Sequence, residues 1–256
     1  MIRVLHLSGG GEHGISILGA LNCLEHKLEI CEVIGTSVGA LIGTLLSICT
    51  IDEIISLCKG LDLVNEVHIE TLFDTFGICD TKHILSLVSN MMKNKMKNEN
   101  PSFKELYEYN NIYVSITGTN ISLQRGEIFN INNTPNMSVL KALEISISIP
   151  LLYESVMHNG FIYSDGGITN MYPSDQCNIT KELKAEEILN IYCIYAYRKI
   201  DDLTSYIHSL IGTLFSGTKH LSCSNTITIT NKIEYSSFQQ LYDEGYVKGM
   251  EYLRNM

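Results

Sequence analysis

The chain has 256 residues, of which 45% are hydrophobic and 18% are charged, a composition typical of a folded globular protein and not of a disordered tail or a fibre. Lys and Arg number 18 against 28 Asp and Glu, so the formal charge is −10. The chain therefore lacks the excess of basic residues that nucleic-acid binding requires. We therefore expect a single domain over residues 1–256 and no nucleic-acid partner.

Targeting and cross-linking signals are absent from the sequence pattern. Residues 1–7 run into a glycine loop before they reach the length of a signal-peptide core, and no later stretch has the roughly 18 uncharged apolar residues of a membrane helix. We expect a cytoplasmic protein without a transmembrane span. The cysteines form no C-x-x-C pair, so we expect reduced, mostly buried thiols and no metal site at Cys23, Cys31, Cys49, Cys58, Cys79, Cys177, Cys193 and Cys223.

The chain opens with two units of strand, glycine turn and helix. Residues 4–7 form an apolar strand candidate, followed by a glycine loop at 8–14 and apolar residues at helical spacing. A second strand at 31–34 meets a glycine turn at 35–39 and then an almost wholly apolar helix at 40–49. Because such crossovers are right-handed and join parallel strands, both glycine turns should lie at the same carboxyl edge of the sheet.

Strands and helices keep alternating in the rest of the chain. Thr50 and Glu53 form a capping box for a helix to about residue 59, and periodicity is weak from 62 to 81. Further helices are expected at 81–97, 103–109, 137–147, 203–215 and 237–254, and further strands at 112–117, 126–131, 160–164, 188–197 and 226–230. The pattern indicates an α/β fold without internal repeats.

The pentapeptide at 35–39 has the G-x-S-x-G form of a nucleophile elbow. In such an elbow Gly35 and Gly39 allow a turn sharp enough to hold Ser37 in a strained, exposed position. The predicted start of a helix at this serine adds partial positive charge that favours a developing alkoxide. Glycine-flanked serines also build ordinary tight turns, so the pentapeptide alone leaves both interpretations open.

The glycine loop before the first helix carries a second candidate site. Gly9, Gly10 and Gly11 supply backbone N–H groups that suit an oxyanion or a phosphate. Residues 9–14 also match the dinucleotide-binding pattern G-x-G-x-x-G. That pattern needs an acidic residue at the end of the second strand, where this chain has only Gly, Thr and Ser, which disfavours a dinucleotide site.

A serine nucleophile needs a base, and Asp165 is a candidate. It ends a predicted strand and is followed by Gly166 and Gly167, although Asp-Gly is also an everyday turn. A Ser-His-Asp triad of the α/β-hydrolase type would instead need a later histidine, which leaves His208 or His220. In that fold, however, several strands precede the elbow, and here the elbow follows the second strand.

Taken in order, the three motifs resemble those of the patatin-like phospholipases. That family has a glycine-rich oxyanion loop, a G-x-S-x-G elbow and an Asp-Gly-Gly or Asp-Gly-Ala motif, and residues 9–14, 35–39 and 165–167 follow the same order. Further similarity is found at residues 102–107, 114–119 and 146–150, at Asn170 and at Pro173.

The resemblance implies a patatin-like three-layer α/β fold, with a central, mostly parallel sheet and helices on both faces. It implies a Ser-Asp dyad without metal or cofactor, in which Ser37 is the nucleophile and Asp165 the base. The oxyanion would be bound by the amides of Gly9, Gly10 and Gly11, and the motif-supporting residues would be His13, Gly14, Gly35, Gly39, Gly166 and Gly167. The family usually has Lys or Arg where this chain has His13, so a positive charge there depends on pH.

The implied activity is phospholipase A type hydrolysis of carboxylic esters in phospholipids or other acyl lipids, through an acyl-enzyme. A serine esterase for small soluble esters and a catalytically silent lipid-binding or scaffold protein are the alternatives. Peripheral membrane contact is also expected. Residues 91–97 could insert methionines among acyl chains and hold Lys93, Lys95 and Lys97 near anionic head groups, or could form a solvated helix end.

Overall fold

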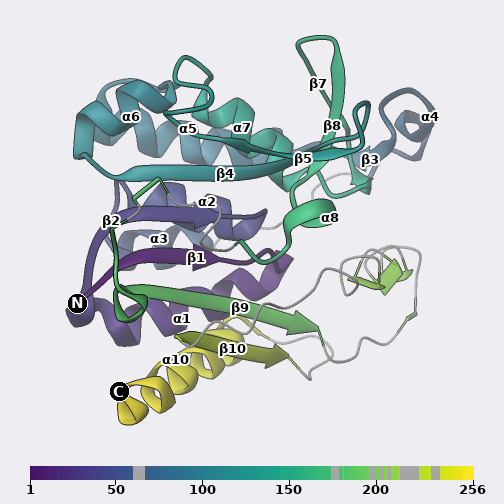
Figure 1. Cartoon of the computed structure of the whole chain (residues 1–256). Coiled ribbons are helices and arrows are strands. Elements are labelled where there is room, and N and C mark those ends of the chain that lie inside the picture. The colour runs from purple at the N-terminus through teal and green to yellow at the C-terminus, as the bar shows by residue number, and fades with distance from the viewer. Residues whose placement is uncertain are drawn as a thin grey trace.

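The computed structural model describes residues 1–59, 67–173, 179–180, 182–195, 200–201, 205–206, 209–210, 212–213, 225–231 and 237–256. Figure 1 shows a sheet running through the molecule, with helices packed along it and the N-terminal strand near its centre.

The main sheet has eight strands in the order β10-β9-β1-β2-β4-β8-β7, and β5 pairs with β4 off this path. Its strands are β1 (Ile2–Leu7), β2 (Leu28–Gly35), β4 (Tyr113–Asn120), β5 (Arg125–Phe129), β7 (Val156–His158), β8 (Phe161–Asp165), β9 (Ile188–Tyr195) and β10 (Thr226–Asn231). Strands β10, β9, β1, β2 and β4 pair in parallel, whereas β5 and β8 are antiparallel to β4, and β7 is antiparallel to β8. A small parallel sheet joins β3 (Gly77–Cys79) to β6 (Leu151–Tyr153).

The helices follow the predicted pattern closely. They are α1 (Gly14–Leu24), α2 (Val38–Leu46), α3 (Ile51–Cys58), α4 (Leu72–Thr75), α5 (Lys82–Met96), α6 (Phe103–Asn110), α7 (Val139–Ile147), α8 (Gly167–Asn170) and α10 (Phe238–Asn255). The capping box predicted for α3 is confirmed, because the Glu53 amide donates to Thr50 Oγ1 and the Thr50 amide donates to the Glu53 carboxylate. The short elements α4 and β3 lie in the stretch where the sequence shows weak periodicity.

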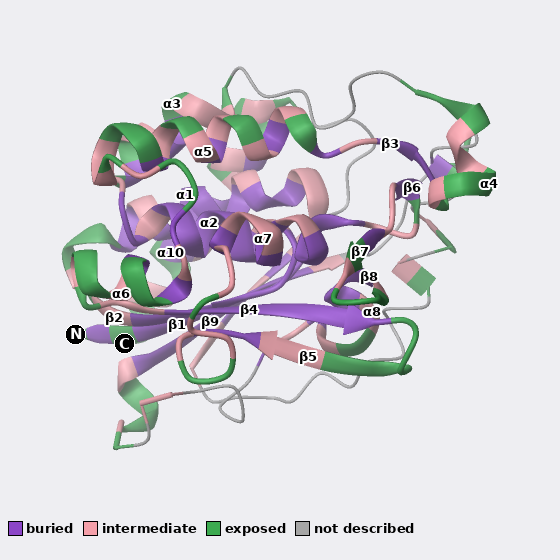
Figure 2. Ribbon diagram, turned by 90° about the horizontal axis from the view of Figure 1, so that it is seen from above, coloured by how far each residue is buried: buried purple, intermediate pink, exposed green. Residues whose placement is uncertain are grey.

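The two faces of the sheet are covered differently. A Cβ placed on Gly118 of β4 would lie 2.7 Å from Ile145 of α7, whereas the next residue, Thr119, contacts Thr169 of α8 through their hydroxyl oxygens at 2.9 Å. Successive residues of a strand point to opposite faces, so α7 lies on one face and α8 on the other. Figure 2 shows α1, α2 and α7 along the α7 face, with α3 and α5 stacked outside them. The predicted fold class, α/β with a central, mostly parallel sheet, is confirmed.

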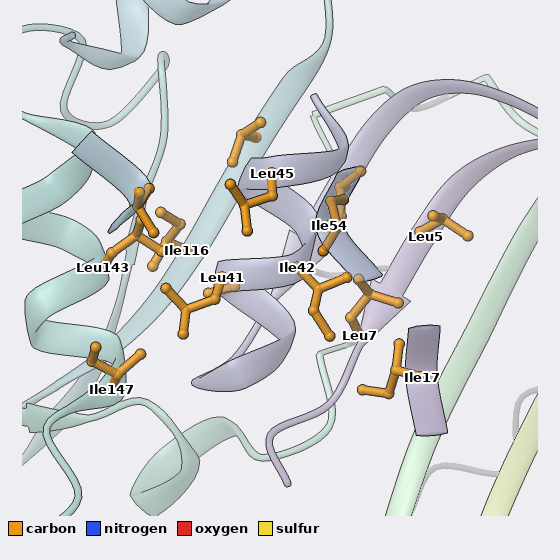
Figure 3. Close-up of a cluster of buried hydrophobic side chains, with 14 of the residues drawn as sticks. Leu5, Leu7, Ile17, Leu41, Ile42, Leu45, Ile54, Ile116, Leu143 and Ile147 are labelled. Atoms are coloured by element: carbon orange, nitrogen blue, oxygen red, sulfur yellow. The ribbon is translucent and has the colours of Figure 1, made fainter. Parts of the chain in front are cut away.

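The main hydrophobic core fills the space between the sheet and helices α1, α2 and α7. Figure 3 shows Leu7 of β1 close to Ile42 of α2 and Ile17 of α1, with Ile116 of β4 beside Leu143 of α7. Leu5, Leu7 and Ile17 are fully buried. This explains why α2 is apolar all round: it lies between the sheet and an outer layer of helices.

The opposite face of the sheet carries buried polar groups. His6 Nδ1 lies 2.7 Å from Asn190 Oδ1, and the buried carboxylate of Glu32 accepts hydrogen bonds from the amides of Ile179 and Thr180. Tyr192 is almost fully buried and donates its hydroxyl hydrogen bond to a backbone carbonyl, as expected of a residue that packs within a strand. These contacts hold Pro173, Ile179 and Thr180 against the sheet.

Some predictions concern residues outside the described ranges. They include His208, His220, Cys177, Cys223, most of the predicted helix at 203–215 and the end of the run at 188–197. All cysteines that the structure describes are free, and burial raises the pKa of the Cys193 thiol to about 12. Within the described part of the chain, no helix is long and apolar enough to cross a bilayer.

Candidate active site

Ser37 lies in the turn between the carboxyl end of β2 and the start of α2. Its backbone has φ 54° and ψ −123°, a conformation that L-residues adopt only when the surrounding structure enforces it. The flanking glycines are required by close packing. A Cβ on Gly35 would lie 2.4 Å from the Ala40 amide nitrogen, and one on Gly39 would lie 2.4 Å from the Leu7 carbonyl oxygen. The G-x-S-x-G pattern therefore encodes a strained turn here, as a nucleophile elbow requires.

Strand register brings Asp165 next to this turn. On β4, Ile116 pairs with Gly35 of β2 and Gly118 pairs with Asp165 of β8. Strand β5 pairs with the opposite edge of β4 at both Ile116 and Gly118. Strands β2 and β8 therefore pair with the same edge of β4, and β8 begins to pair where β2 ends. The last residue of β2 and the last residue of β8 therefore pair with β4 only two positions apart, at Ile116 and Gly118. This places the serine and the aspartate beside each other although they are far apart in sequence.

The carboxyl group of Asp165 is buried and strongly perturbed. Burial raises its pKa from the ordinary 3.8 to about 7, while the Ser37 hydroxyl and the Gly167 amide act in the opposite direction. The Gly167 amide donates to Oδ1 at 2.6 Å. Among the described residues, no donor meets ordinary hydrogen-bond geometry at Oδ2. The carboxylate therefore has spare capacity to accept a proton.

The end of α7 holds both residues in place. The Ser37 amide donates to Ser146 Oγ at 3.0 Å, and the Asp165 amide donates to the Ser148 carbonyl at 2.8 Å. The Gly166 amide reaches the Ser146 carbonyl at 3.4 Å. Sequence reasoning assigned no role to Ser146. Its place on the buried side of a largely apolar helix was the signal available, because a buried hydroxyl needs a polar partner.

Threonines connect the same strands from the other face of the sheet. Thr36 Oγ1 donates to the Asn170 carbonyl at 2.7 Å and lies 2.8 Å from Thr117 Oγ1. Thr119 donates to the Asp165 carbonyl at 2.8 Å. A Cβ on Gly166 would lie 2.2 Å from Thr117 Oγ1, so only glycine fits after the aspartate. The first glycine of the predicted Asp-Gly-Gly motif is thus a packing requirement of this junction.

The glycine loop after β1 lies against the elbow. A Cβ on Gly9 would lie 3.4 Å from the Cβ of Ser37, and Gly11 has φ 53°. The Gly9 amide donates to the Met171 carbonyl at 3.3 Å. Of the three amides predicted as oxyanion donors, it is the one for which the described part of the chain provides an acceptor. Among the described residues, no acceptor is found for the Gly10 and Gly11 amides.

His13 and Gly14 support the loop. His13 is buried, its amide donates to the Gly10 carbonyl at 3.0 Å, and its carbonyl accepts a weak hydrogen bond from the Cys193 thiol at 3.6 Å. A Cβ on Gly14 would lie 2.3 Å from Val38, so the first turns of α1 and α2 pack directly together. The two helix N-termini therefore meet beside the candidate nucleophile, as the pattern of two glycine turns predicts.

An apolar cavity of about 70 Å³ begins at this junction. Gly11, Glu12 and Val38 line one end of it, and the side chains of α1, α2, α3 and α5 line the remainder. Apart from Glu12 and glycine backbone its walls are aliphatic or sulfur-containing. Such a cavity suits a hydrocarbon chain. Among the described residues, no group of three or more His, Cys, Asp or Glu side chains could hold a metal ion.

Comparisons with known proteins agree with this geometry. A family model described as patatin-like phospholipase matches residues 5–177. The protein "Probable lipid hydrolase 463L" of Invertebrate iridescent virus 6 is 33% identical over 181 residues, which cover 68% of this chain and 62% of that protein. Protein R571 of Acanthamoeba polyphaga mimivirus is 34% identical over 182 residues, covering 67% and 60%. The match thus spans less than two thirds of either relative.

Solved structures show the same fold. VipD from Legionella pneumophila superposes with a TM-score of 0.67 at 17% identity, covering 99% of this chain and 67% of that chain. The type III effector ExoU gives a TM-score of 0.56 at 17% identity, covering 99% and 53%. The ordered motifs, the strained elbow beside a buried aspartate and the family match over most of the sequence lead to one conclusion: the chain belongs to the patatin-like phospholipase family.

Proposed function

We propose that this protein is a lipid acyl hydrolase of phospholipase A type that acts through a Ser37–Asp165 dyad. Ser37 Oγ attacks the ester carbonyl carbon and its proton passes to the Asp165 carboxylate. The tetrahedral oxyanion then collapses, and Asp165 returns the proton to the departing alcohol oxygen. Water, deprotonated by Asp165, attacks the acyl-enzyme, so that a fatty acid leaves and Ser37 regains its proton.

One observation carries the proposal: a serine held at φ 54° lies beside a fully buried carboxyl whose pKa is raised to about 7. An ordinary aspartate is too weak a base to take a proton from a serine, and a raised pKa strengthens it while still leaving much of it ionised near neutral pH. The paired start of α1 and α2 adds positive electrostatic potential where the oxyanion forms.

The oxyanion contacts in this proposal come chiefly from the Gly10 and Gly11 amides. Gly9 contributes in a different way, because its amide fastens the loop to Met171 and its missing side chain leaves room for the Met171 sulfur, which would lie 2.8 Å from a Cβ there. The part played by His13 is to shape this loop from a buried position.

The apolar cavity supports a lipid as substrate over a small soluble ester. It starts at Gly11 and Val38, next to the nucleophile, and runs between helices whose facing side chains are apolar. The methylene groups of an acyl chain would gain free energy from burial against these apolar walls. The viral relative described as a probable lipid hydrolase supports the same substrate class. Single-domain organisation over 1–256 and cytoplasmic action at membrane surfaces complete the proposal.

The test is product analysis on phospholipids of defined acyl chains, together with labelling by a fluorophosphonate probe. We expect release of free fatty acid and labelling of Ser37, both lost in Ser37→Ala. Ser56→Ala is the matched control, since Ser56 is an exposed serine of α3 whose hydroxyl donates to the carbonyl of Asp52.

Each rival predicts a different result. A soluble esterase would show no increase in rate when the same ester passes from monomers to micelles. A silent lipid-binding protein would fold, bind vesicles and leave Ser37 unlabelled. Either result would refute the proposed lipid hydrolase.

A further inference from the structure

A cluster of large apolar side chains projects into solvent around α4. Val67, Ile69, Phe73 and Phe76 lie within one short stretch and are each at least half exposed, with Phe73 86% exposed. Scattered exposed apolar residues are normal, but four within ten positions, two of them aromatic, are the sign of an interaction surface. Figure 2 shows α4 largely in the colour of exposed residues.

The β7–β8 hairpin extends this apolar surface. The Ser155 amide, just before β7, donates to the Thr75 carbonyl at the end of α4 at 2.8 Å. Strand β3, which follows α4, pairs with β6. These contacts join α4 to a second group of exposed apolar residues, namely Leu151 at 41%, Met157 at 62% and Phe161 at 37%. We call Val67, Ile69, Phe73, Phe76, Leu151, Met157 and Phe161 the apolar rim.

The apolar rim lies at the same end of the molecule as the candidate active site. In Figure 1 strand β9 points toward this end, and in Figure 2 strand β4 does, with α4, β3, β6, β7 and α8 gathered there. The connection is also short along the chain. The Ser148 carbonyl binds the Asp165 amide, and Leu151 of the apolar rim follows Ser148 almost at once.

The basic segment that the sequence suggested for membrane contact has other partners. Met92 is fully buried, Lys93 pairs with Glu99 at 2.8 Å and Lys95 pairs with Glu53 at 2.6 Å. The segment therefore matches its alternative, a solvated helix end. Around α4 the exposed charged residues include Glu70 and Asp74, so anionic head groups would be repelled there.

We propose that the apolar rim is the surface on which the protein rests on a zwitterionic lipid bilayer, with Phe73 and Met157 inserted between the lipids and the Ser37 site turned toward them. This inference rests on the proposed lipid hydrolase function, because a membrane-resident substrate must reach a site at this end of the sheet. Contact is made by apolar insertion, so it depends little on salt.

The test is co-sedimentation with phosphatidylcholine vesicles, performed in a Ser37→Ala background so that turnover plays no part. We expect Phe73→Ser to weaken binding roughly tenfold, and Phe73→Ser combined with Met157→Ser to weaken it further, because each loses the burial of a large apolar side chain. Val247→Ser is the matched control: Val247 is 53% exposed on α10, away from α4 in both views, and its loss should leave binding unchanged.

Activity separates this inference from the proposed function. In the wild-type background, Phe73→Ser should lower the rate on vesicles and keep the rate on a monomeric ester. If wild type cleaves no ester while vesicle binding still depends on Phe73, the docking surface stands and the enzyme proposal fails. Equal binding by Phe73→Ser and wild type would overturn the inference. Binding that requires anionic lipid and is lost in a Lys93, Lys95 and Lys97 triple Glu variant would also overturn it, as would self-association that Phe73→Ser abolishes.

Discussion

Asp165→Asn should inactivate the protein and at the same time stabilise it. The folded state holds this carboxyl at a pKa of about 7, and the unfolded chain returns it to 3.8, so ionising it in place costs free energy. A difference of about 3 units between the folded and unfolded pKa lowers the free energy of unfolding by about 4 kcal/mol once the carboxyl is fully ionised. Asn keeps the side-chain oxygen that accepts from the Gly167 amide and has no charge to bury.

The sign of this effect is fixed by linkage. Because the folded pKa is raised, the folded state binds more protons than the unfolded state between pH 3.8 and about 7, and stability falls as pH rises through that window. The free energy of unfolding of Asp165→Asn should therefore exceed that of the wild type by close to zero at about pH 3, by about 2 kcal/mol at about pH 5 and by about 4 kcal/mol at about pH 8.

Urea unfolding of wild type and Asp165→Asn at these pH values measures the difference directly, with Ser56→Ala as the control that should show no pH-dependent change. Activity measured on the same samples should fall by at least about a thousandfold in Asp165→Asn, because the base is lost. An unfolding difference that is the same at about pH 5 and about pH 8 would refute the claim that burial perturbs this carboxyl.

The remaining predictions address the rate, the turn, its support and metal ions. Because Asp165 must be ionised to accept a proton, the rate on a monomeric ester should rise with pH and reach half its plateau at about pH 7. A flat pH–rate profile would contradict this. Gly39→Ala sets a Cβ 2.4 Å from the Leu7 carbonyl oxygen, so its free energy of unfolding in urea should fall by at least about 2 kcal/mol, and a wild-type midpoint would show that the turn can relax. Ser146→Ala removes the acceptor of the Ser37 amide and should slow fluorophosphonate labelling about tenfold, an effect that unchanged labelling kinetics would exclude. EDTA should leave the rate unchanged, since a serine and a carboxylate perform every proposed step, and a loss that Zn²⁺ or Ca²⁺ restores would show otherwise.

Local structure in this protein can be predicted from the amino-acid sequence alone. The tight turn around Ser37 is encoded locally at Gly35, because a Cβ there would lie 2.4 Å from the Ala40 amide nitrogen five positions further on. The capping box at Thr50 and the helices at 103 and 139 follow likewise from interactions between residues a few positions apart. Such features depend on neighbours in the chain, so a single sequence specifies them, and the order of three local motifs was enough to indicate the family.

Contacts between residues far apart in the sequence become visible only in the folded chain. That Asp165 lies beside Ser37 depends on β8 pairing with β4 where β2 leaves it, and alternation of residue types does not encode strand order or register across so long a separation. The role of Ser146, the engagement of the Gly9 amide by Met171 and the raised pKa of Asp165 all depend on that same packing. The exposure of a side chain also depends on tertiary packing. Met92 and Phe73 are both large apolar residues in helices, but Met92 faces the core and Phe73 faces solvent. Burial depends on what packs against a residue and not on its type.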